Sequence, residues 1–362
     1  MSFRSKGRPL AVATALVSGL ALLAPAAPAS AHRSHQLAVR QVNLVSDQAG
    51  KAALQDPDLV NPWGLSLGAT TPLWSSDNGT SASTLYSSVP GSNTATKVAA
   101  IRVSVPVPTG QVNNPGTGFV LSNGTTRAPA NFIFATEKGQ IAAWSRLVDP
   151  PIGDAEIKAT TPGAVYKGLA LANDHLFAAN FSQRRIDVFD SSFQPVKLPR
   201  WAFRDNRLPR GYAPFNVQAL GDRIFVSYAL LNRQTDDEIA GPGRGFVDEY
   251  STDGKLVARV GSRGGLNAPW GLAFAPAAWG QPAGTLLVGN FGDGHINIFR
   301  PSPYGGFRFA GQVHDSHGRT LVIDGLWALL QGTATTGGTD VLWFSAGPDD
   351  ESHGLLGQLQ MP

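Results

Sequence analysis

The sequence contains no cysteine and few charged residues, and both shortages narrow what the chain can be. Without cysteine there is no disulfide and no thiolate chemistry, so stability has to come from packing and sheet closure. Charged residues make up 15%, whereas 41 Gly and 26 Pro without a collagen-like period are typical of a turn-rich β protein. No Gly-x-x-x-x-Gly-Lys loop is found, which disfavours nucleotide chemistry. We see no basic cluster with interleaved aromatics and expect no nucleic acid partner.

Long apolar runs are also scarce, and the longest predicts a secretory signal peptide. Arg4, Lys6 and Arg8 precede apolar residues 10–23, and small residues follow at 29–31. The run is shorter than the ~20 residues of a membrane span, so we expect no span. Residues 1–31 are therefore predicted to be removed, leaving one secreted domain, residues 32–362. This loss lowers the formal net charge from +3 to zero, so the basic balance indicates no partner.

A repeat with a period of about fifty residues organises the rest of the chain. The anchor at 61–65, Asn-Pro-Trp-Gly-Leu, returns at 268–272 as Ala-Pro-Trp-Gly-Leu and more loosely at 325–329 as Gly-Leu-Trp-Ala-Leu. Weaker echoes occur at 167–170 and 214–217, and residues 118–120 fill the remaining gap, which gives six units. Short apolar runs bounded by Gly, Pro, Asn or Asp follow each anchor and predict four antiparallel strands per unit.

These runs predict where the strands lie. Second strands are expected at 73–76, 131–136, 175–181, 223–231, 285–291 and 340–345. Third strands are expected at 83–87, 141–144, 185–189, 245–250, 295–299 and 353–359, and fourth strands at 96–103, 155–159, 195–198, 256–261 and 307–313. The last unit stops at its third strand, and residues 36–45 alternate like the missing fourth.

Pairing of residues 36–45 with the last unit would close the ring and remove the exposed sheet edges. The sequence therefore predicts an all-β fold, a six-bladed β-propeller of four-stranded antiparallel blades closed by its N-terminal strand. A β-sandwich or a right-handed β-helix explains neither the period nor the three-strand last unit.

Seven stretches also look familiar: residues 107–111, 131–137, 166–170, 211–216, 287–294, 322–327 and 344–355. Together they resemble an uncharacterised family of secreted bacterial proteins, some of which carry a Pro-Glu-Pro-type C-terminal sorting tail. The resemblance spans roughly residues 42–359 and implies the propeller fold but no activity. This chain lacks the tail, so we expect release rather than surface sorting. At fold level the chain is also similar to NHL-type and gluconolactonase-like propellers.

Strand direction predicts which residues share one end of the ring. The loop that enters a first strand lies at the same end as the turn between the second and third strands. The insertion at 234–244, with Asp236, Asp237 and Glu238, reaches this end and is most simply a surface loop, although it could form a lid. The other residues on this rim are Asn61, Pro62, Trp63, Asp77, Asn78, Glu137, Asn180, Asn216, Pro269, Trp270, Asn290, Asp293, Asp324, Asp349, Asp350 and His353.

Side-chain oxygens on this rim suggest a ligand or a metal ion. The candidate ligand-binding residues are Asn180, Asn216, Asn290 and Asp293. Oxygens of Asp77, Asn180 and Asn290 could hold Ca²⁺, which takes six to eight oxygen ligands. The alternative is turn chemistry, because Asn and Asp bond nearby backbone and tolerate left-handed φ.

Catalytic signals are weaker. Asp349, Glu351 and His353 lie in one hairpin and could supply a general acid and base, or they could form a solvated turn. His314 and His317 could begin a zinc or iron site, although exposed loop histidines are the simpler interpretation.

The sequence favours a secreted, monomeric binding module that holds a small molecule or an extracellular protein at the axial mouth. The alternative is a Ca²⁺-dependent hydrolase or lactonase of the gluconolactonase-like type, in which Ca²⁺ polarises a carbonyl or a water. A protein-interaction platform using the whole rim is a third hypothesis. Whether the chain is an enzyme stays open, and Ca²⁺ is the one cofactor considered.

Overall fold

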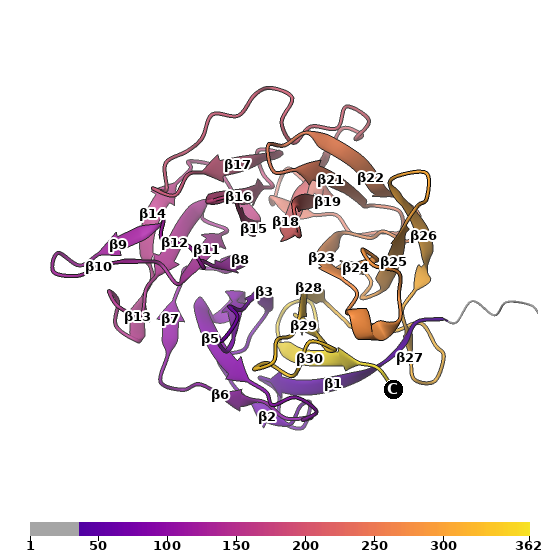
Figure 1. Cartoon of the computed structure of the whole chain (residues 1–362), viewed down its shortest axis with the longest axis horizontal. Coiled ribbons are helices and arrows are strands. Elements are labelled where there is room, and N and C mark those ends of the chain that lie inside the picture. Colours follow the sequence, from indigo (N-terminus) through magenta and orange to yellow (C-terminus); the bar gives the residue numbers. More distant parts are fainter. Residues whose placement is uncertain (1–35) are drawn as a thin grey trace, which may run out of the picture. The chain divides into compact units, whose positions relative to one another are not determined.

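The repeat units fold into small antiparallel sheets that stand around a common axis (Figure 1). This is the computed structural model of the chain, and it describes residues 36–362. The predicted signal peptide and the expected mature N-terminus at His32 lie outside the described residues. Six sheets form a six-bladed β-propeller, which confirms the predicted fold.

Each blade runs from an inner strand at the axis to an outer strand. The first contains β3 (Pro62–Ser66), β4 (Leu73–Asp77), β5 (Ala82–Ser87) and β7 (Arg102–Ser104), and the second contains β8 (Pro108–Asn113), β11 (Phe132–Thr136), β12 (Gln140–Trp144) and β14 (Glu156–Thr160). The third contains β15 (Tyr166–Ala172), β16 (His175–Asn180) and β17 (Arg185–Phe189). The fourth contains β18 (Tyr212–Leu220), β19 (Arg223–Asn232), β21 (Phe246–Ser251) and β22 (Leu256–Ser262). The fifth contains β23 (Pro269–Phe274), β24 (Leu286–Asn290), β25 (Ile296–Pro301) and β26 (Phe307–Gln312). The sixth contains β28 (Leu326–Gln331), β29 (Leu342–Ala346), β30 (Leu355–Gln360) and β1 (Ala38–Ser46).

Short elements decorate these blades. The added strands are β2 (Leu54–Gln55), β6 (Thr96–Lys97), β13 (Ile152–Asp154), β20 (Asp237–Glu238) and β27 (His314–Asp315), and β9 (Val120–Ser122) pairs with β10 (Arg127–Pro129) in a separate hairpin. Two 3₁₀ turns lie at Asn78–Thr80 and Ala277–Trp279. In the described part of the chain no helix is long and apolar enough to cross a membrane.

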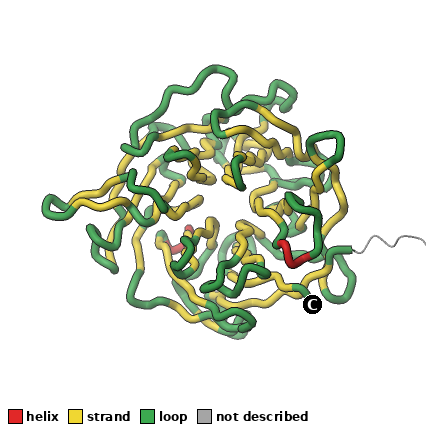
Figure 2. The backbone as a smooth tube through the Cα atoms, viewed as in Figure 1, coloured by secondary structure: helices red, strands yellow, loops and turns green. Residues whose placement is uncertain are grey.

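The ring closes between the two ends of the described chain. β1 pairs antiparallel with β30, with Arg40 opposite Gln360 and Ser46 opposite Leu355. Each inner strand contacts the inner strand of the next blade, and β28 contacts β3. The N-terminal strand therefore completes the last blade as predicted, and Figure 2 shows the strands surrounding the axis.

All six inner strands carry a β-bulge at the same place. At the bulge, each inner strand has one residue more than the second strand between the flanking pairs of the ladder. The bulge positions are Trp63, Thr109, Lys167, Phe215, Trp270 and Trp327. A small residue usually follows, because the inner strands lie very close together: a Cβ on Gly110 would lie 2.2 Å from the backbone N of Leu169.

Three details of the predicted strands are wrong. The inner strand of the second blade is β8, not residues 118–120. The prediction missed it because Thr109-Gly110-Gln111 contains no aromatic residue like those of the other anchors. Phe119 instead packs on Phe193 beside the β9–β10 hairpin. The fourth strand expected at 96–103 is divided into β6 and β7. The third blade has no fourth strand at 195–198, where Pro195 forms a single bridge to Phe189, because prolines at 195 and 199 cannot donate to a ladder.

Candidate functional site

The bulges turn six side chains toward one end of the axis, and five of them are uncharged. Trp63 stacks on Trp327 with ring centroids 3.7 Å apart and meets Trp270 edge-on at 6.4 Å. Phe215 joins this aromatic group, with its ring centroid 5.9 Å from that of Trp327. Lys167 is the one charged residue among the six positions, and its Nζ lies 4.9 Å from the centroid of the Trp63 ring. The axis is therefore filled with aromatic rings that carry one buried ammonium group.

Carboxylates from other blades surround this ammonium group. Lys167 Nζ lies 2.7 Å from Oε1 of Glu137, in the β11–β12 turn, and 3.1 Å from Oδ1 of Asp237, in β20. Asn78 Nδ2 donates to the other oxygen of Glu137 (3.1 Å). The Lys167 side chain is 2% exposed, whereas that of Asp237 is 58% exposed, so the insertion hairpin forms the solvent side of the site.

Glu351 reaches the same place from the sixth blade. Asn61 Nδ2 donates to Oε2 of Glu351 (2.6 Å), and Asn61 Oδ1 accepts from Nε1 of Trp327 (2.9 Å). Asp349, Asp350 and Glu351 have φ values of +57°, +51° and +64°, a left-handed run that is unfavourable for residues with a Cβ. Strained backbone of this kind is concentrated at functional sites.

Burial and charge oppose each other in this group, which we call the charged cluster: Lys167, Glu137, Asp237, Glu238 and Glu351. Burial alone would lower the pKa of Lys167, but the carboxylates of Glu137, Glu238 and Asp237 outweigh it and raise the pKa to about 12. Burial raises the pKa of Glu238 to about 7, against the attraction of Lys167. Burial also raises the pKa of Glu351, although Asn61 and Lys167 favour its charged form. Lys167 is therefore a fixed cation, and Glu238 can exchange a proton near neutral pH.

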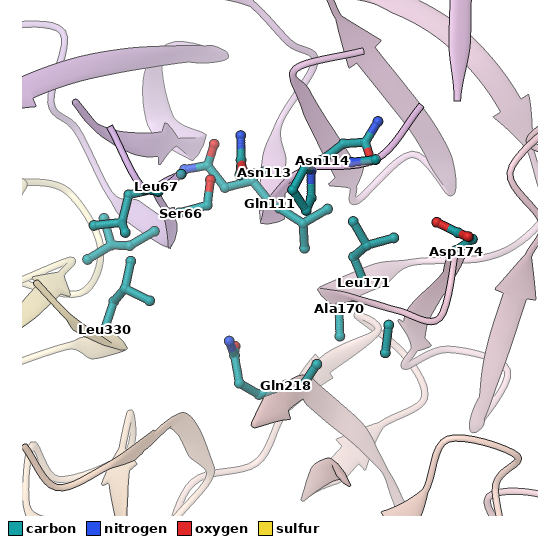
Figure 3. A pocket seen from close by; sticks show the side chains of 18 of the residues that line it. Ser66, Leu67, Gln111, Asn113, Asn114, Ala170, Leu171, Asp174, Gln218 and Leu330 are labelled. Carbon is teal, nitrogen blue, oxygen red and sulfur yellow. The ribbon is translucent and has the colours of Figure 1, made fainter. Parts of the chain in front are cut away.

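The opposite end of the axis holds an open pocket of about 560 Å³ (Figure 3). Its walls come from the far ends of the inner strands and combine leucines and alanines with amides. Gln111 Nε2 already donates to the carbonyls of Gly64 and Trp74, and Asn114 Nδ2 donates to those of Gly118 and Ala130. Gln218 points into the pocket and has no side-chain hydrogen bond within residues 36–362. The open end therefore offers space, but most of its amides are already used.

The predicted ligand-binding amides do not face a shared mouth. Asn180 Nδ2 donates to Asp187 (2.6 Å) within the third blade, and Asn290 Nδ2 donates to Asp293 (2.9 Å) within the fifth. Asn216 lies between neighbouring inner strands, where its Nδ2 donates to the carbonyl of Trp270 (2.8 Å). Of these four residues, the structure brings together Asn290 and Asp293, in one turn.

The three residues predicted for Ca²⁺ lie in three different blades, Asp77 in the first, Asn180 in the third and Asn290 in the fifth. Both oxygens of Asp77 accept hydroxyl hydrogens, from Ser75 (2.7 Å) and Thr84 (2.6 Å), and burial raises its pKa well above the usual range. Asn180 Oδ1 accepts from the N–H of Gln183, three residues along its own chain. No hydrogen bond links any two of Asp77, Asn180 and Asn290 in the described chain, and no group of three His, Asp or Glu there is placed to hold a metal.

The three catalytic candidates are separated. Glu351 joins the charged cluster, whereas Nδ1 of His353 lies 2.8 Å from Oδ2 of Asp47, and Asp349 is exposed. His314 lies in β27 beside β1, and the His317 side chain is 76% exposed. Sequence reasoning missed Lys167 as a functional residue. The sequence feature that could have identified it is a lysine at a repeat position that is aromatic in four of the six blades.

Comparison with known proteins gives relatives but no activity. No family model matches the chain. "Uncharacterized protein L690" of Acanthamoeba polyphaga mimivirus is 35% identical over 326 residues, which cover 87% of this chain and 84% of the viral protein. "Uncharacterized protein R648" of the same virus is 33% identical over 327 residues, covering 87% and 78%. These relatives are viral, whereas the resemblance implied bacterial ones.

Solved structures share the fold at low identity. A streptogramin B lyase superposes with a TM-score of 0.51 at 11% identity, covering 90% of this chain and 97% of that chain. A putative gluconolactonase has a TM-score of 0.47 at 19% identity, covering 70% and 78%. The likeness to the lyase concerns the fold alone.

Proposed function

The chain belongs to the same family as these two mimivirus proteins, and we propose that it is a binding module for a small organic cation. The cation would bind at the charged cluster. A neutral or acidic ligand would find no comparable partner there, because Lys167, the one cation of the cluster, is already paired.

One observation carries this proposal: two partly buried carboxylates have no cation of their own. The ion pairs of Lys167 go to Glu137 and Asp237. Glu351 has one amide donor, and Glu238 has no side-chain partner among the residues described. An unpaired carboxylate that is partly removed from water is costly, and the raised pKa values of Glu238 and Glu351 express that cost.

An amine or guanidinium group would relieve this cost. It would pair with Glu238 and Glu351, and the Trp63 ring beside the cluster would add an attraction between cation and aromatic face. The ligand would enter past the insertion hairpin, where Asp237 is exposed. We expect an organic cation rather than a metal ion, because the carboxylates do not converge as metal ligands do in the described residues.

Tryptophan fluorescence offers a direct test, since Trp63 lies beside Lys167. The purified chain would be titrated with methylguanidine, ethanolamine and tetramethylammonium, with glucose as a neutral control and CaCl₂ as a metal control. Binding should be lost in the double variant Glu238→Gln, Glu351→Gln. It should be kept in the control double variant Glu156→Gln, Glu249→Gln. If no organic cation binds better than glucose, or if the first double variant binds as well as the parent, the proposal is wrong.

A hydrolase that needs no calcium is the second candidate, favoured by the pKa of about 7 at Glu238. Glu238 would accept a proton from an attacking water, and the ammonium of Lys167 would stabilise a developing oxyanion. Lactone hydrolysis that persists with EDTA and falls in Glu238→Gln would support this candidate. Hydrolysis that EDTA abolishes would instead support the Ca²⁺-dependent lactonase.

We also propose that the module is secreted, on the charge and apolar pattern of residues 1–31. Expression of the whole chain in a secreting bacterial host and sequencing of the mature N-terminus test this proposal. Protein in the medium that begins near His32 is the expected result, and uncleaved protein inside the cells would contradict it.

A further inference from the structure

The third blade differs from the other five because its outer edge is open. β17 pairs with β16, and no fourth strand of residues 36–362 pairs with its outer side. The connection to β18, residues 190–211, forms a long outer loop (Figures 1 and 2). An unpaired strand edge can pair with another extended chain.

Backbone hydrogen bonds show which groups of β17 are free. Val196 N–H donates to the carbonyl of Val188 (2.8 Å), and Asp190 N–H donates to the carbonyl of Gln194 (2.9 Å). The backbone of Val188 therefore faces outward, and that of Ile186 does too, because direction alternates along a strand. The N–H and C=O of Ile186 have no hydrogen-bond partner within residues 36–362. The outer edge of β17 is thus paired near its C-terminal end, at Val188, and unpaired near its N-terminal end, at Ile186.

Two cavities line this open edge. One, of about 650 Å³, lies along β17 and is closed on its other side by residues 195–204; the second, of about 700 Å³, continues toward β18. Arg184, Arg185, Phe203 and Arg204 line both, so the cavities form one groove. The groove follows the strand edge rather than crossing it.

The groove is strongly basic. Its five arginines are Arg184, Arg185, Arg200, Arg204 and Arg210. Arg185 is paired with Asp187, and no other of these five has a salt bridge in the part of the chain described. The remaining carboxylate of the groove, Asp205, is held by Arg207 and Arg259. Four guanidinium groups are therefore available to a ligand.

We propose that an acidic peptide segment, in extended conformation, binds this groove as the fourth strand of the third blade. Its backbone would bond to the free N–H and C=O of Ile186, which supplies pairing without sequence preference. Its Asp or Glu side chains would meet Arg184, Arg200, Arg204 and Arg210, since arginine binds carboxylates through two parallel hydrogen bonds. A free strand edge favours a peptide over a small multivalent anion or a nucleic acid, neither of which can extend a sheet.

The probe is a fluorescein-labelled peptide of alternating glutamate and valine, measured by anisotropy with the whole chain. A second peptide carries N-methyl groups on alternate amides, which blocks pairing but keeps the charge. The N-methylated peptide should bind about tenfold more weakly, the loss expected when backbone hydrogen bonds are removed. A lysine–valine peptide should not bind.

Protein variants separate the groove from charge in general. Arg184→Glu with Arg204→Glu should abolish binding, whereas the matched pair Arg127→Glu with Arg308→Glu, on exposed strands elsewhere, should leave it unchanged. Circular dichroism checks that both pairs fold. The proposal is overturned if the glutamate–valine peptide and its N-methylated form bind equally. It is also overturned if tripolyphosphate or a single-stranded oligonucleotide binds more tightly than the glutamate–valine peptide, or if the Arg127→Glu, Arg308→Glu variant loses as much affinity as the groove variant.

Discussion

The two ends of the propeller axis differ in what they hold and in how open they are. At one end the charged cluster is covered by the insertion hairpin and keeps two carboxylates without a cation. At the other end a pocket of about 560 Å³ is open, but Gln111 and Asn114 spend their amides on backbone carbonyls. The open pocket therefore lies at the end without a charged cluster. Space alone is a poor guide to the site in this ring.

Removing the central cation should have the largest effect. Lys167→Met leaves Glu137 and Asp237 without their partner, and breaking a buried ion pair costs about 3–5 kcal/mol. We expect the lower part of that range, because the Asp237 side chain is exposed and screened by water. Urea denaturation followed by tryptophan fluorescence measures the loss. A cost below about 1 kcal/mol, the size of a surface pair, would remove the contrast between the two ends.

Titration of Glu238 should give the next largest effect. Its folded pKa, about 7, lies above its ordinary value, so the folded state holds the proton more tightly. Wild-type stability should therefore fall as pH rises from about 4.5 through 7, by about 3 kcal/mol relative to Glu238→Gln. Unfolding free energies of both proteins at a series of pH values check this. A constant difference between them across that window would show that Glu238 titrates normally.

Two asparagines, one at each end, sharpen the comparison. Asn61→Ala removes two hydrogen bonds of a buried amide and Asn114→Ala removes three, so the two changes should cost about 2 and about 3 kcal/mol. Asn61→Ala should also raise the pKa of Glu351 further, because its amide favours the charged form. The pH dependence of unfolding should thus change in Asn61→Ala and stay as in the parent in Asn114→Ala. Identical pH profiles would contradict the assignment of Asn61 to the cluster.

The smallest effect is expected at the open pocket. Gln218→Leu removes an amide with no side-chain hydrogen bond in the described residues, so stability should change by less than about 0.5 kcal/mol. Urea denaturation beside Lys167→Met measures both on one scale. A loss of more than about 1 kcal/mol would mean that the pocket end is held as tightly as the charged end.

The fold could be predicted because propeller strands leave a local pattern. Residues 286–290 are buried at every position of β24, so their apolar run marks a strand packed on both faces. The strand at 36–45 was predictable from its alternation, and its partner from the incomplete last unit. The inner strand of the second blade was missed because Thr109 and Gln111 replace the apolar residues that mark its equivalents.

The candidate site was predictable as an end of the ring but not as a set of contacts. Alternating strand direction places Glu137, Glu351 and the insertion at one rim, and the charged cluster lies there. Asn180 and Asn290 share that rim, yet each side chain turns into its own hairpin. Chain direction decides the end, whereas side-chain direction depends on neighbours that lie far away in the sequence.

By itself, the sequence determined the number of blades, most of their strands and the closure of the ring, since those follow from short-range patterns of apolar residues and turns. Only the tertiary structure decided that Lys167 stands among carboxylates of three other blades, and that the third blade keeps an open edge beside arginines. The physical reason is that burial and charge depend on every neighbour in space. Local periodicity records only whether a side chain faces inward.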